Sequence, residues 1–307
     1  MIETFPSWSA ALLPVAVVVF VWMAVTFEAV VRAAPARAPL TAAMAEPLRS
    51  AAFLLVQQRR VLVGSDRLLW RAGAMALMLA AVLAAAVVPF GNRVVADSAV
   101  SLVWFNAMEV VAWAAVWLAG WGPNSTFSLV GGYRFVAQGL AYELPHMFAL
   151  ITVAVGAGSL RVADVVAAQQ GLWFVVWMPA AFVVYLLSVL AMSFMPPFRQ
   201  AVSSDIAGGV LAELSGVDRL VFLTGRWSLF VAGAAMAVPL FLGGGSGPLL
   251  PAWLWSVIKT VIVVVVLVWA GRRVPTMRME RFEEFSWVVL LPVMLVQTLI
   301  VSILAVA

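Results

Sequence analysis

Long uncharged apolar stretches recur along the whole sequence. A helix that crosses a lipid bilayer needs about twenty mostly apolar residues. With 65% hydrophobic and only 10% charged residues, the chain lies far from a soluble domain, in which about a quarter of residues are charged. We therefore predict an all-α polytopic membrane protein, with residues 1–307 forming a single integral membrane domain. The predicted spans are residues 9–31, 70–90, 98–119, 135–159, 171–195, 221–243, 252–271 and 285–306.

Arginines are distributed unevenly between the two sides that these spans define. Two of them, Arg93 and Arg161, fall in one set of loops, and fifteen fall in the other set. Because positive charge favours the cytoplasmic side, the basic loops should face inward and both chain termini outward. The longest inward loops are residues 34–69 and 196–220. The basic set contains Arg32, Arg37, Arg49, Arg59, Arg60, Arg67 and Arg71, then Arg134, then Arg199, Arg219 and Arg226, and finally Arg272, Arg273, Arg278 and Arg281.

The first inward loop carries a helical pattern of its own. Between residues 40 and 61, apolar side chains recur at helical spacing, and polar ones take the other faces. Pro47 suits the first turn of a helix. The pattern predicts an amphipathic helix that lies in the inner interface of the membrane. The alternative is an ordinary basic loop. The apolar positions are Leu40, Met44, Leu48, Ala51, Ala52 and Leu55.

Charged residues inside the apolar spans are the strongest functional signal. Glu109, Glu143 and Lys259 interrupt three spans, and Glu28 lies near the inner end of a fourth. An ionisable group in hydrocarbon is poorly solvated, so it indicates a functional site by default. Such groups favour a protein that handles ions, protons or a charged cofactor. His146 follows Glu143 by three residues and shares its helix face, as a proton carrier or as a hydrogen-bonded packing residue.

Composition excludes several kinds of cofactor site. The chain has no cysteine, so it holds no disulfide and no cysteine-ligated iron–sulfur cluster or zinc ion. A single histidine argues against a histidine-built metal or haem site. We predict no metal site, and the basic charge, which sits at span ends, does not indicate nucleic-acid binding.

Five segments in order resemble a known family, the membrane component of respiratory complex I that meets the peripheral arm (the H subunit in bacteria, subunit 1 in mitochondria). The first, residues 120–143, is similar to the family pattern of GW, a short polar stretch, YSLLG, an Arg and then SYE. The others are DIAGGVLAELSG at 205–216, FLGG at 241–244, Lys259 in WLWSVIK, and MRMERFEEFSW at 277–287. The matching positions of the first segment are Gly120, Trp121, Ser128, Leu129, Gly131, Arg134, Tyr142 and Glu143.

The resemblance implies a subunit of a proton-translocating NADH- or ferredoxin-quinone oxidoreductase in the bacterial inner membrane. It would form the floor of a quinone cavity and the start of a lateral proton path. Its partners would be a peripheral arm, antiporter-like membrane subunits and the lipid bilayer. The implied proton path contains Glu109, Glu143, Asp205, Glu213 and Lys259. The residues implied for the quinone cavity or arm contact are Glu28, Arg134, Tyr142, Arg199, Arg226 and Arg278.

Other roles for these charged groups remain open. Each acid could instead pair with an arginine to fix helix packing, and Arg134 is the candidate for Glu143. Nine residues on one helix nevertheless separate those two by about 13 Å along the axis. Lys259 lies far from both ends of its span, so we expect an interior partner, with Glu109 as a candidate.

The third inward loop departs from the family pattern. Arg199 stands where the family has an Asp, and uncharged residues replace an acidic run at 200–204, while Asp205 and Glu213 retain acids. Arg226 falls where the family often has a Glu. We expect these two arginines to lie beside the quinone cavity and raise its electrostatic potential. The alternatives are the equivalent subunit of a membrane-bound hydrogenase and a stand-alone ion transporter.

Overall fold

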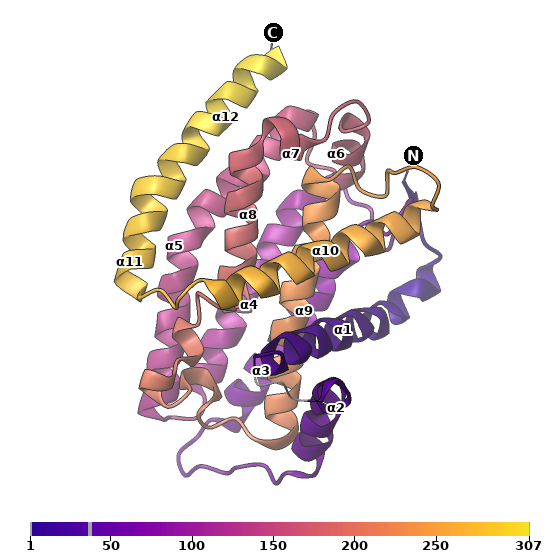
Figure 1. The fold of residues 1–307 in the computed structure, drawn as a ribbon. Helices are drawn as coiled ribbons and strands as arrows, with labels where there is room; N and C mark the ends of the chain where they lie inside the picture. The colour runs from indigo at the N-terminus through magenta and orange to yellow at the C-terminus, as the bar shows by residue number, and fades with distance from the viewer. Residues whose placement is uncertain (1, 36–38, 307) are drawn as a thin grey trace.

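Helices form almost the whole of the computed structural model, which describes residues 2–35 and 39–306 (Figure 1). Within those residues, seven helical segments are long and apolar enough to cross a membrane. The prediction of an all-α polytopic membrane protein is confirmed. The seven segments are α1 (Leu13–Ala33), α3 (Arg67–Ala86), α4 (Ser101–Trp121), α5 (Thr126–Ala157), α9 (Gly216–Phe241), α10 (Ala252–Arg273) and the continuous run of α11 (Met279–Phe285), η5 (Ser286–Leu290) and α12 (Leu291–Val306).

The fifth predicted span, 171–195, is not one helix. It consists of the short α7 (Phe174–Trp177) and the 14-residue α8 (Pro179–Met192), which meet at Met178. Pro179 occupies the first turn of α8, and the residue before a proline is driven out of the helical conformation. At 1.5 Å per residue α8 is about 21 Å long, shorter than a bilayer core of about 30 Å.

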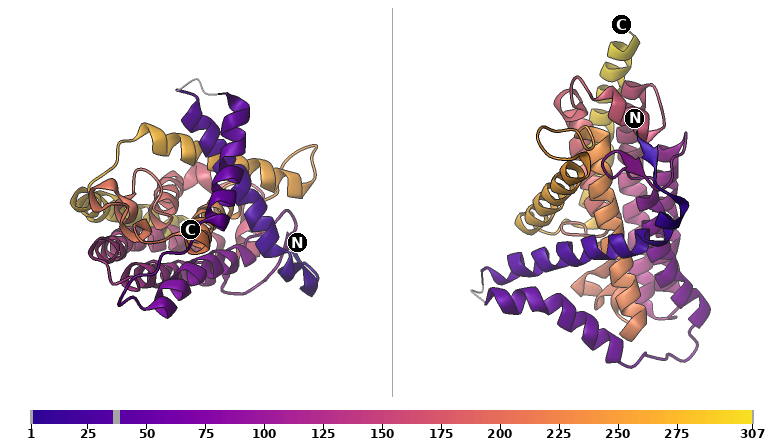
Figure 2. Two further views of the ribbon diagram at one scale, coloured as in Figure 1. Left: turned by 90° about the horizontal axis from the view of Figure 1, so that it is seen from below. Right: turned by 90° about the vertical axis from the view of Figure 1, so that its right-hand side faces the viewer.

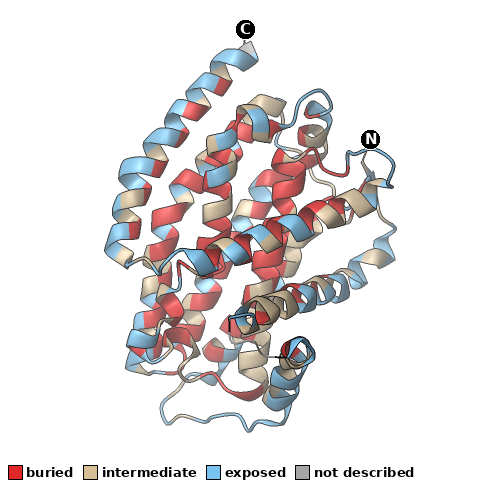
Figure 3. Cartoon of the chain, in the orientation of Figure 1, coloured by how far each residue is buried: buried red, intermediate tan, exposed pale blue. Residues whose placement is uncertain are grey.

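Five helices form the core of the bundle. α3 packs against α4 and α9, α4 packs against α5, and α5 packs against α8. α9 is the most buried of the spans, and the buried residues concentrate on these five helices (Figure 3). Small residues permit the close approach: a Cβ added to Gly73 on α3 would lie 2.5 Å from the backbone nitrogen of Ala119 on α4. Close packing through small residues is typical of helices in membranes.

Two helices cross this core obliquely, and a third lies at its edge. α1 and α10 run at a steep angle to the upright helices, and α12 leans along the outside of α5 (Figures 1 and 2). α1 and α12 expose apolar side chains such as Trp22, Leu299 and Ile303. These outward faces suit contact with lipid or with other membrane subunits.

The predicted amphipathic helix is present as α2 (Leu40–Val56), which ends five residues before the expected boundary. It packs its small buried residues, Ala43 and Pro47, toward α1 and α9. Placing Pro47 in the first turn was wrong, because the helix begins at Leu40 and Pro47 lies inside it. α2 exposes six large apolar side chains, namely Leu40, Met44, Leu48, Phe53, Leu55 and Val56.

The basic loops gather at one end of the bundle, which we call the inner end. The loop after α2 is tied there to the start of α9: the Arg60 backbone N–H donates to Ser215 Oγ at 2.6 Å, and the Gly216 N–H donates to Gln57 Oε1 at 2.9 Å. At the opposite end lie β1 (Glu3–Thr4), β2 (Arg93–Val94) and α6 (Val162–Ala168), together with the last turns of α12 (Figure 1). Arg37, which we assigned to the first basic loop, lies outside the described residues.

Candidate functional site

A fully buried acid and the sole histidine of the chain meet in the middle of the bundle. Glu109 on α4 and His146 on α5 have no exposed side-chain surface. Glu109 Oε1 lies 3.3 Å from His146 Nε2, which is ion-pair range. Neither side chain has a hydrogen-bond partner among the described residues, so the two atoms lie at ion-pair distance without forming a hydrogen bond. Because hydrocarbon solvates neither group, each depends on the other and on any internal water for stabilisation.

Glu143 lies one turn before His146 and completes the cluster. Its Oε1 accepts a hydrogen bond from Asn106 Nδ2 at 2.9 Å, whereas its buried Oε2 has no partner among the described residues. Glu143, Glu109 and Asn106 therefore hold several unsatisfied polar atoms in one small region between α4 and α5. Buried polar atoms without protein partners are the usual positions of internal water.

Two tyrosines border the cluster. The Tyr142 hydroxyl accepts a hydrogen bond from Trp113 Nε1 at 2.7 Å, with the two rings edge to face. On α8, the Tyr185 ring stacks on the His146 imidazole, with centroids 5.2 Å apart and an interplanar angle of 30°. The Tyr185 hydroxyl donates to the Gly233 carbonyl at 2.9 Å, so the ring that orients the imidazole is itself fixed.

The position of Glu143 differs from the expected one. We predicted that its span begins at residue 135, but α5 begins at Thr126, so Glu143 lies near the middle of a 32-residue helix. Pairing of Arg134 with Glu143 was wrong. Arg134 Nη1 instead donates to Asp205 Oδ2 at 2.8 Å at the inner surface. Hydrogen bonds from Ser203 and Arg134 hold the pKa of Asp205 below its usual value.

Lys259 does not pair with Glu109, contrary to our expectation. Its ammonium group donates to the carbonyl oxygens of Leu242, Gly244 and Ser246, at 2.6, 2.9 and 2.8 Å. It also lies 4.2 Å from the centroid of the Trp173 ring. Leu242 caps the C-terminus of α9, and Gly244 and Ser246 lie in the loop that follows, so none of these carbonyls accepts from a further helical turn. The three N–H groups of Lys259 supply the donors instead.

Arg226, on α9, binds the carbonyls at the C-terminal end of α8, much as Lys259 binds those after α9. This buried guanidinium donates through Nε to the Ser193 carbonyl at 3.0 Å and through Nη2 to the Phe194 carbonyl at 2.6 Å. It also lies 4.6 Å from the centroid of the Phe194 ring. Arg226 therefore closes a helix end inside the bundle, while Arg199 and Arg278 are exposed at the inner end.

The remaining predicted residues lie in ionic contacts between elements at the inner end. Glu28 on α1 pairs with Arg32 one turn away and with Arg272 on α10. Glu213 accepts hydrogen bonds from Arg60 Nη1 at 2.9 Å and from Ser125 Oγ at 3.0 Å. The predicted site residues thus separate into the buried cluster, two carbonyl-bound cations and a set of inner-end groups.

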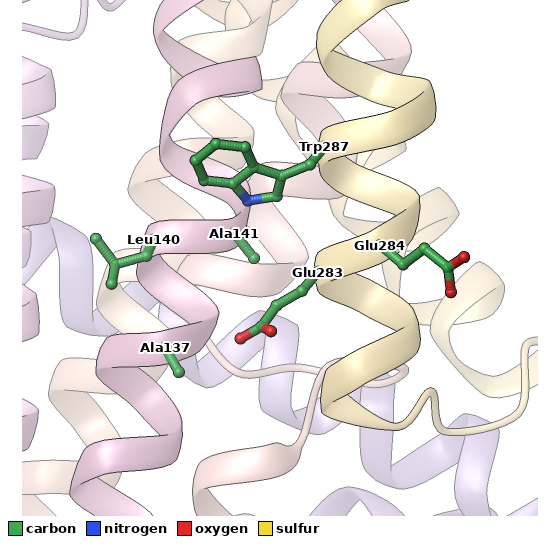
Figure 4. A pocket seen from close by; sticks show the side chains of 6 residues that line it. All are labelled: Ala137, Leu140, Ala141, Glu283, Glu284 and Trp287. Carbon is green, nitrogen blue, oxygen red and sulfur yellow. The ribbon is translucent and has the colours of Figure 1, made fainter.

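Two grooves lie on the surface of α5, and the second of them borders the buried cluster at Asn106. One, of about 430 Å³, lies between α5 and α11, with Glu283 directed toward α5 and Glu284 away from it (Figure 4). The other is a small apolar groove between α4 and α5. Neither is lined by a residue that we predicted for the quinone cavity. Across residues 2–35 and 39–306, no group of three His, Asp or Glu side chains is placed to hold a metal ion.

The sequence located Glu109 and Glu143 but missed how they are held. Asn106, Trp113 and Tyr185 were not singled out, because an Asn, a Trp or a Tyr in an apolar span is ordinary on its own. Only the spacing of Asn106 and Glu109, three residues apart on one helix face, gives a signal for them. Chemically, the cluster offers two carboxylates and an imidazole, which can accept and release protons in an interior that excludes bulk water.

The chain is similar to known proteins over most of its length. The family model described as NADH dehydrogenase matches residues 7–302. The chain is 33% identical over 266 residues to the NADH-quinone oxidoreductase H subunit 2 of Geobacter sulfurreducens, covering 83% of this chain and 81% of the relative. It is 35% identical over 264 residues to the corresponding H subunit 2 of Rhodopseudomonas palustris (83% and 80%). It is 33% identical over 266 residues to the H subunit 1 of Geobacter metallireducens (83% and 81%).

Proposed function

Since this chain belongs to the NADH dehydrogenase family of membrane subunits, we propose that it anchors a complex I-type, proton-translocating quinone oxidoreductase in a bacterial inner membrane. In that complex it forms the membrane floor of the quinone cavity and the start of a lateral proton path. The chain has no cysteine to ligate an iron–sulfur cluster, so its own part is to bind partners and move protons, while other subunits carry the electrons.

The buried cluster of Glu109, Glu143 and His146 is the observation that carries this proposal. A chain that needed only to anchor partners would gain stability from apolar residues at these positions, because burying charge is costly. Side chains from facing helices instead converge on one small polar region. Groups arranged in this way transfer protons between neighbours within hydrogen-bond reach or through one water.

We call the chain of proton-carrying groups on this path the relay. We assign Glu143 and Glu109 to its part inside the membrane, and Asp205 and Glu213 to its part at the inner end of the bundle. Asp205 and Glu213 already pair with arginines at the surface, which favours a role in attracting and delivering protons. The carbonyl contacts of Lys259 support a structural role at the outer end of α10.

We propose that the quinone headgroup binds at the inner end, in a cavity that the peripheral arm completes. The exposure of Arg199 and Arg278 supports a contact with the arm or the quinone there, and the Glu28–Arg272 pair is a further candidate. Arg134 remains a candidate for the same contact through its pair with Asp205. Tyr142 and Arg226 are buried, and their polar atoms already form hydrogen bonds inside the bundle. We therefore assign them a packing role near the quinone cavity and no direct contact with the quinone.

The partners that co-purify with the chain test this proposal. We expect a tagged chain, extracted in mild detergent, to bring down a peripheral arm with flavin and iron–sulfur subunits and several further membrane subunits. A nickel-containing subunit in the arm would assign the chain to a membrane-bound hydrogenase instead. A monodisperse, transport-active chain without partners would contradict the proposal and favour a stand-alone transporter.

A further inference from the structure

We propose that His146 and Glu109 form a proton-sharing pair that serves as a carrier of its own in the relay. This inference rests on the proposed function and adds the imidazole to a path of carboxylates. The geometry supports it directly. Nε2 and Oε1 lie 3.3 Å apart, and both side chains are fully buried. Among the described residues neither nitrogen of His146 has a hydrogen-bond partner, so Nε2 is free to exchange a proton with Oε1.

The pair can hold one proton in two forms of equal net charge. In the first, Glu109 is a neutral carboxylic acid and His146 is a neutral imidazole. In the second, the proton has moved from Oε1 to Nε2, which leaves a carboxylate beside an imidazolium. The net charge of the pair is zero in both forms, and a zero net charge is what a low-dielectric interior favours. One proton therefore stays on the pair and shifts between its two atoms without charging the interior.

Glu143 supplies the input that moves this proton. It lies three residues from His146 on the same helix face and within electrostatic range of both members of the pair. When Glu143 gains a proton, the negative charge beside the pair disappears, and the balance between the two forms changes. The pair can then accept a proton at one atom while it releases one from the other, so the interior never carries two unpaired charges.

The surroundings of the pair contain few other groups that titrate. Tyr142 and Tyr185 border it, and both hydroxyls are bound elsewhere, to Trp113 and Gly233. α12 also packs against α5, and its residues 291–306 include no titratable side chain. Other charged groups beside α5 are engaged away from the pair: Arg134 and Asp205 at the inner surface, Asp164 with Arg161 at the outer end, and Glu283 at the groove with α11.

Tyr185 acts as a positioning residue for the imidazole. Its ring stacks on His146, and its hydroxyl is anchored to α9, so the imidazole is held with Nε2 toward Glu109. A histidine that served only as packing would be expected to bind a backbone carbonyl, because buried polar groups are normally satisfied. Its ion-pair partner among the described residues is instead a buried carboxylate.

A double-mutant cycle in the whole complex, reconstituted in proteoliposomes, tests the proposal. The variants are His146→Gln, Glu109→Gln and the double variant, with proton transport per electron measured across pH. Each single variant should lower coupled proton transport by at least about tenfold, because it removes a positioned proton-transfer group. Each should also remove an inflection between about pH 6 and pH 8 that an imidazole-containing carrier produces.

The double variant should lose no more coupled proton transport than either single variant, because the two side chains act as one unit. Its two neutral amides can hydrogen-bond to each other, so it should assemble even where a single variant does not. Ser188→Ala is the matched control, because Ser188 is buried on α8 and its hydroxyl bonds only to its own helix, at the Val184 carbonyl. It should leave both the pumping ratio and the pH profile unchanged.

Two outcomes separate this proposal from the proposed function. Wild-type pumping and pH profile in the assembled double variant would overturn the pair, as would additive losses in the two single variants. If Glu143→Gln abolishes coupling while the pair variants do not, the pair is wrong and Glu109 leaves the proton path, whereas Glu143 and the proposed function stand. If Glu143→Gln also pumps normally, the relay itself is wrong.

Discussion

At the scale of single residues, buried cations and buried acids have different kinds of partner. Arg226 and Lys259 donate to backbone carbonyls at the ends of helices and in the loop that follows α9. Glu109 and Glu143 lie beside groups that can donate or exchange protons, namely His146 and the Asn106 amide. The two cations therefore stabilise helix ends, and the two acids remain available for chemistry.

Replacing Arg226 with Met should destabilise the protein rather than change its substrate affinity. The variant keeps an unbranched apolar side chain but leaves the Ser193 and Phe194 carbonyls without donors, at a cost of roughly 1–3 kcal/mol for each buried group. Thermal unfolding of the detergent-solubilised complex checks this, with Arg199→Met as the exposed control. If Arg226→Met left the stability unchanged and altered the KM for quinone, Arg226 would instead contact the quinone, which contradicts this prediction.

The Asp97–Arg161 pair should make stability depend on pH at the outer end. The Arg161 guanidinium donates to both Asp97 oxygens and holds the pKa of Asp97 below its usual 3.8. A carboxyl whose pKa is lower in the folded than in the unfolded state stabilises the protein at pH values above its unfolded-state pKa. That stabilisation is lost as the pH falls through its folded-state pKa. Asp97→Asn should therefore lower the Tm near neutral pH and flatten its decline below about pH 4. Glu3→Gln, exposed at the same end, is the control, and an equal acid decline in both variants would contradict the assignment.

Sequence reasoning located the buried acids because charge in an apolar span is conspicuous. It could not find their partners, because those depend on the rotation and register of α4 against α5. Lys259 shows the same limit. Its partners are carbonyls at the end of α9 and in the loop after it, and no side-chain pattern in the sequence marks a backbone carbonyl that needs a donor.

At the scale of elements, apolar length predicted most of the spans and failed at two of them. α5 begins nine residues before the predicted boundary, because Arg134 lies within a helix that extends to the inner surface and pairs with Asp205 there. The span at 171–195 is interrupted at Met178, because Pro179 drives the residue before it out of the helical conformation. The prediction rested on apolar composition alone and took no account of this proline.

The exposed apolar face of α2 should lie in the membrane interface. The chain has no cysteine, so a single introduced cysteine reports on one position. A spin label at Leu48→Cys should be relaxed by oxygen, which partitions into lipid, more than by a water-soluble nickel chelate. A label at the exposed neighbour Arg49→Cys should show the reverse preference. Equal access of the chelate to both labels would support an ordinary basic loop.

At the scale of the whole molecule, the bundle has a basic end and an end that holds both chain termini (Figure 1). We propose that the basic end faces the cytoplasm, in keeping with the bias of arginine toward cytoplasmic loops. The peripheral arm would then cover the inner end, and the cluster of Glu109, Glu143 and His146 would lie inside the membrane beneath it.

Labelling of single cysteines in intact cells tests this orientation. The fully exposed Leu249 lies between α9 and α10, and the fully exposed Val63 lies in the basic loop before α3. With the outer membrane permeabilised, a membrane-impermeant maleimide should label Leu249→Cys and leave Val63→Cys unlabelled. Labelling of Val63→Cys in cells with an intact inner membrane would reverse the assigned orientation.

Proton transport per electron in a Glu143→Gln variant tests the central claim most directly. The amide keeps the size of Glu143 and its hydrogen bond with Asn106 but cannot carry a proton. We predict that the assembled complex, reconstituted in proteoliposomes, loses coupled proton transport by about tenfold or more. Glu143→Asp should be milder, because the carboxylate survives with a shorter reach. A Glu143→Gln complex that assembles normally and pumps at the wild-type ratio would contradict the account.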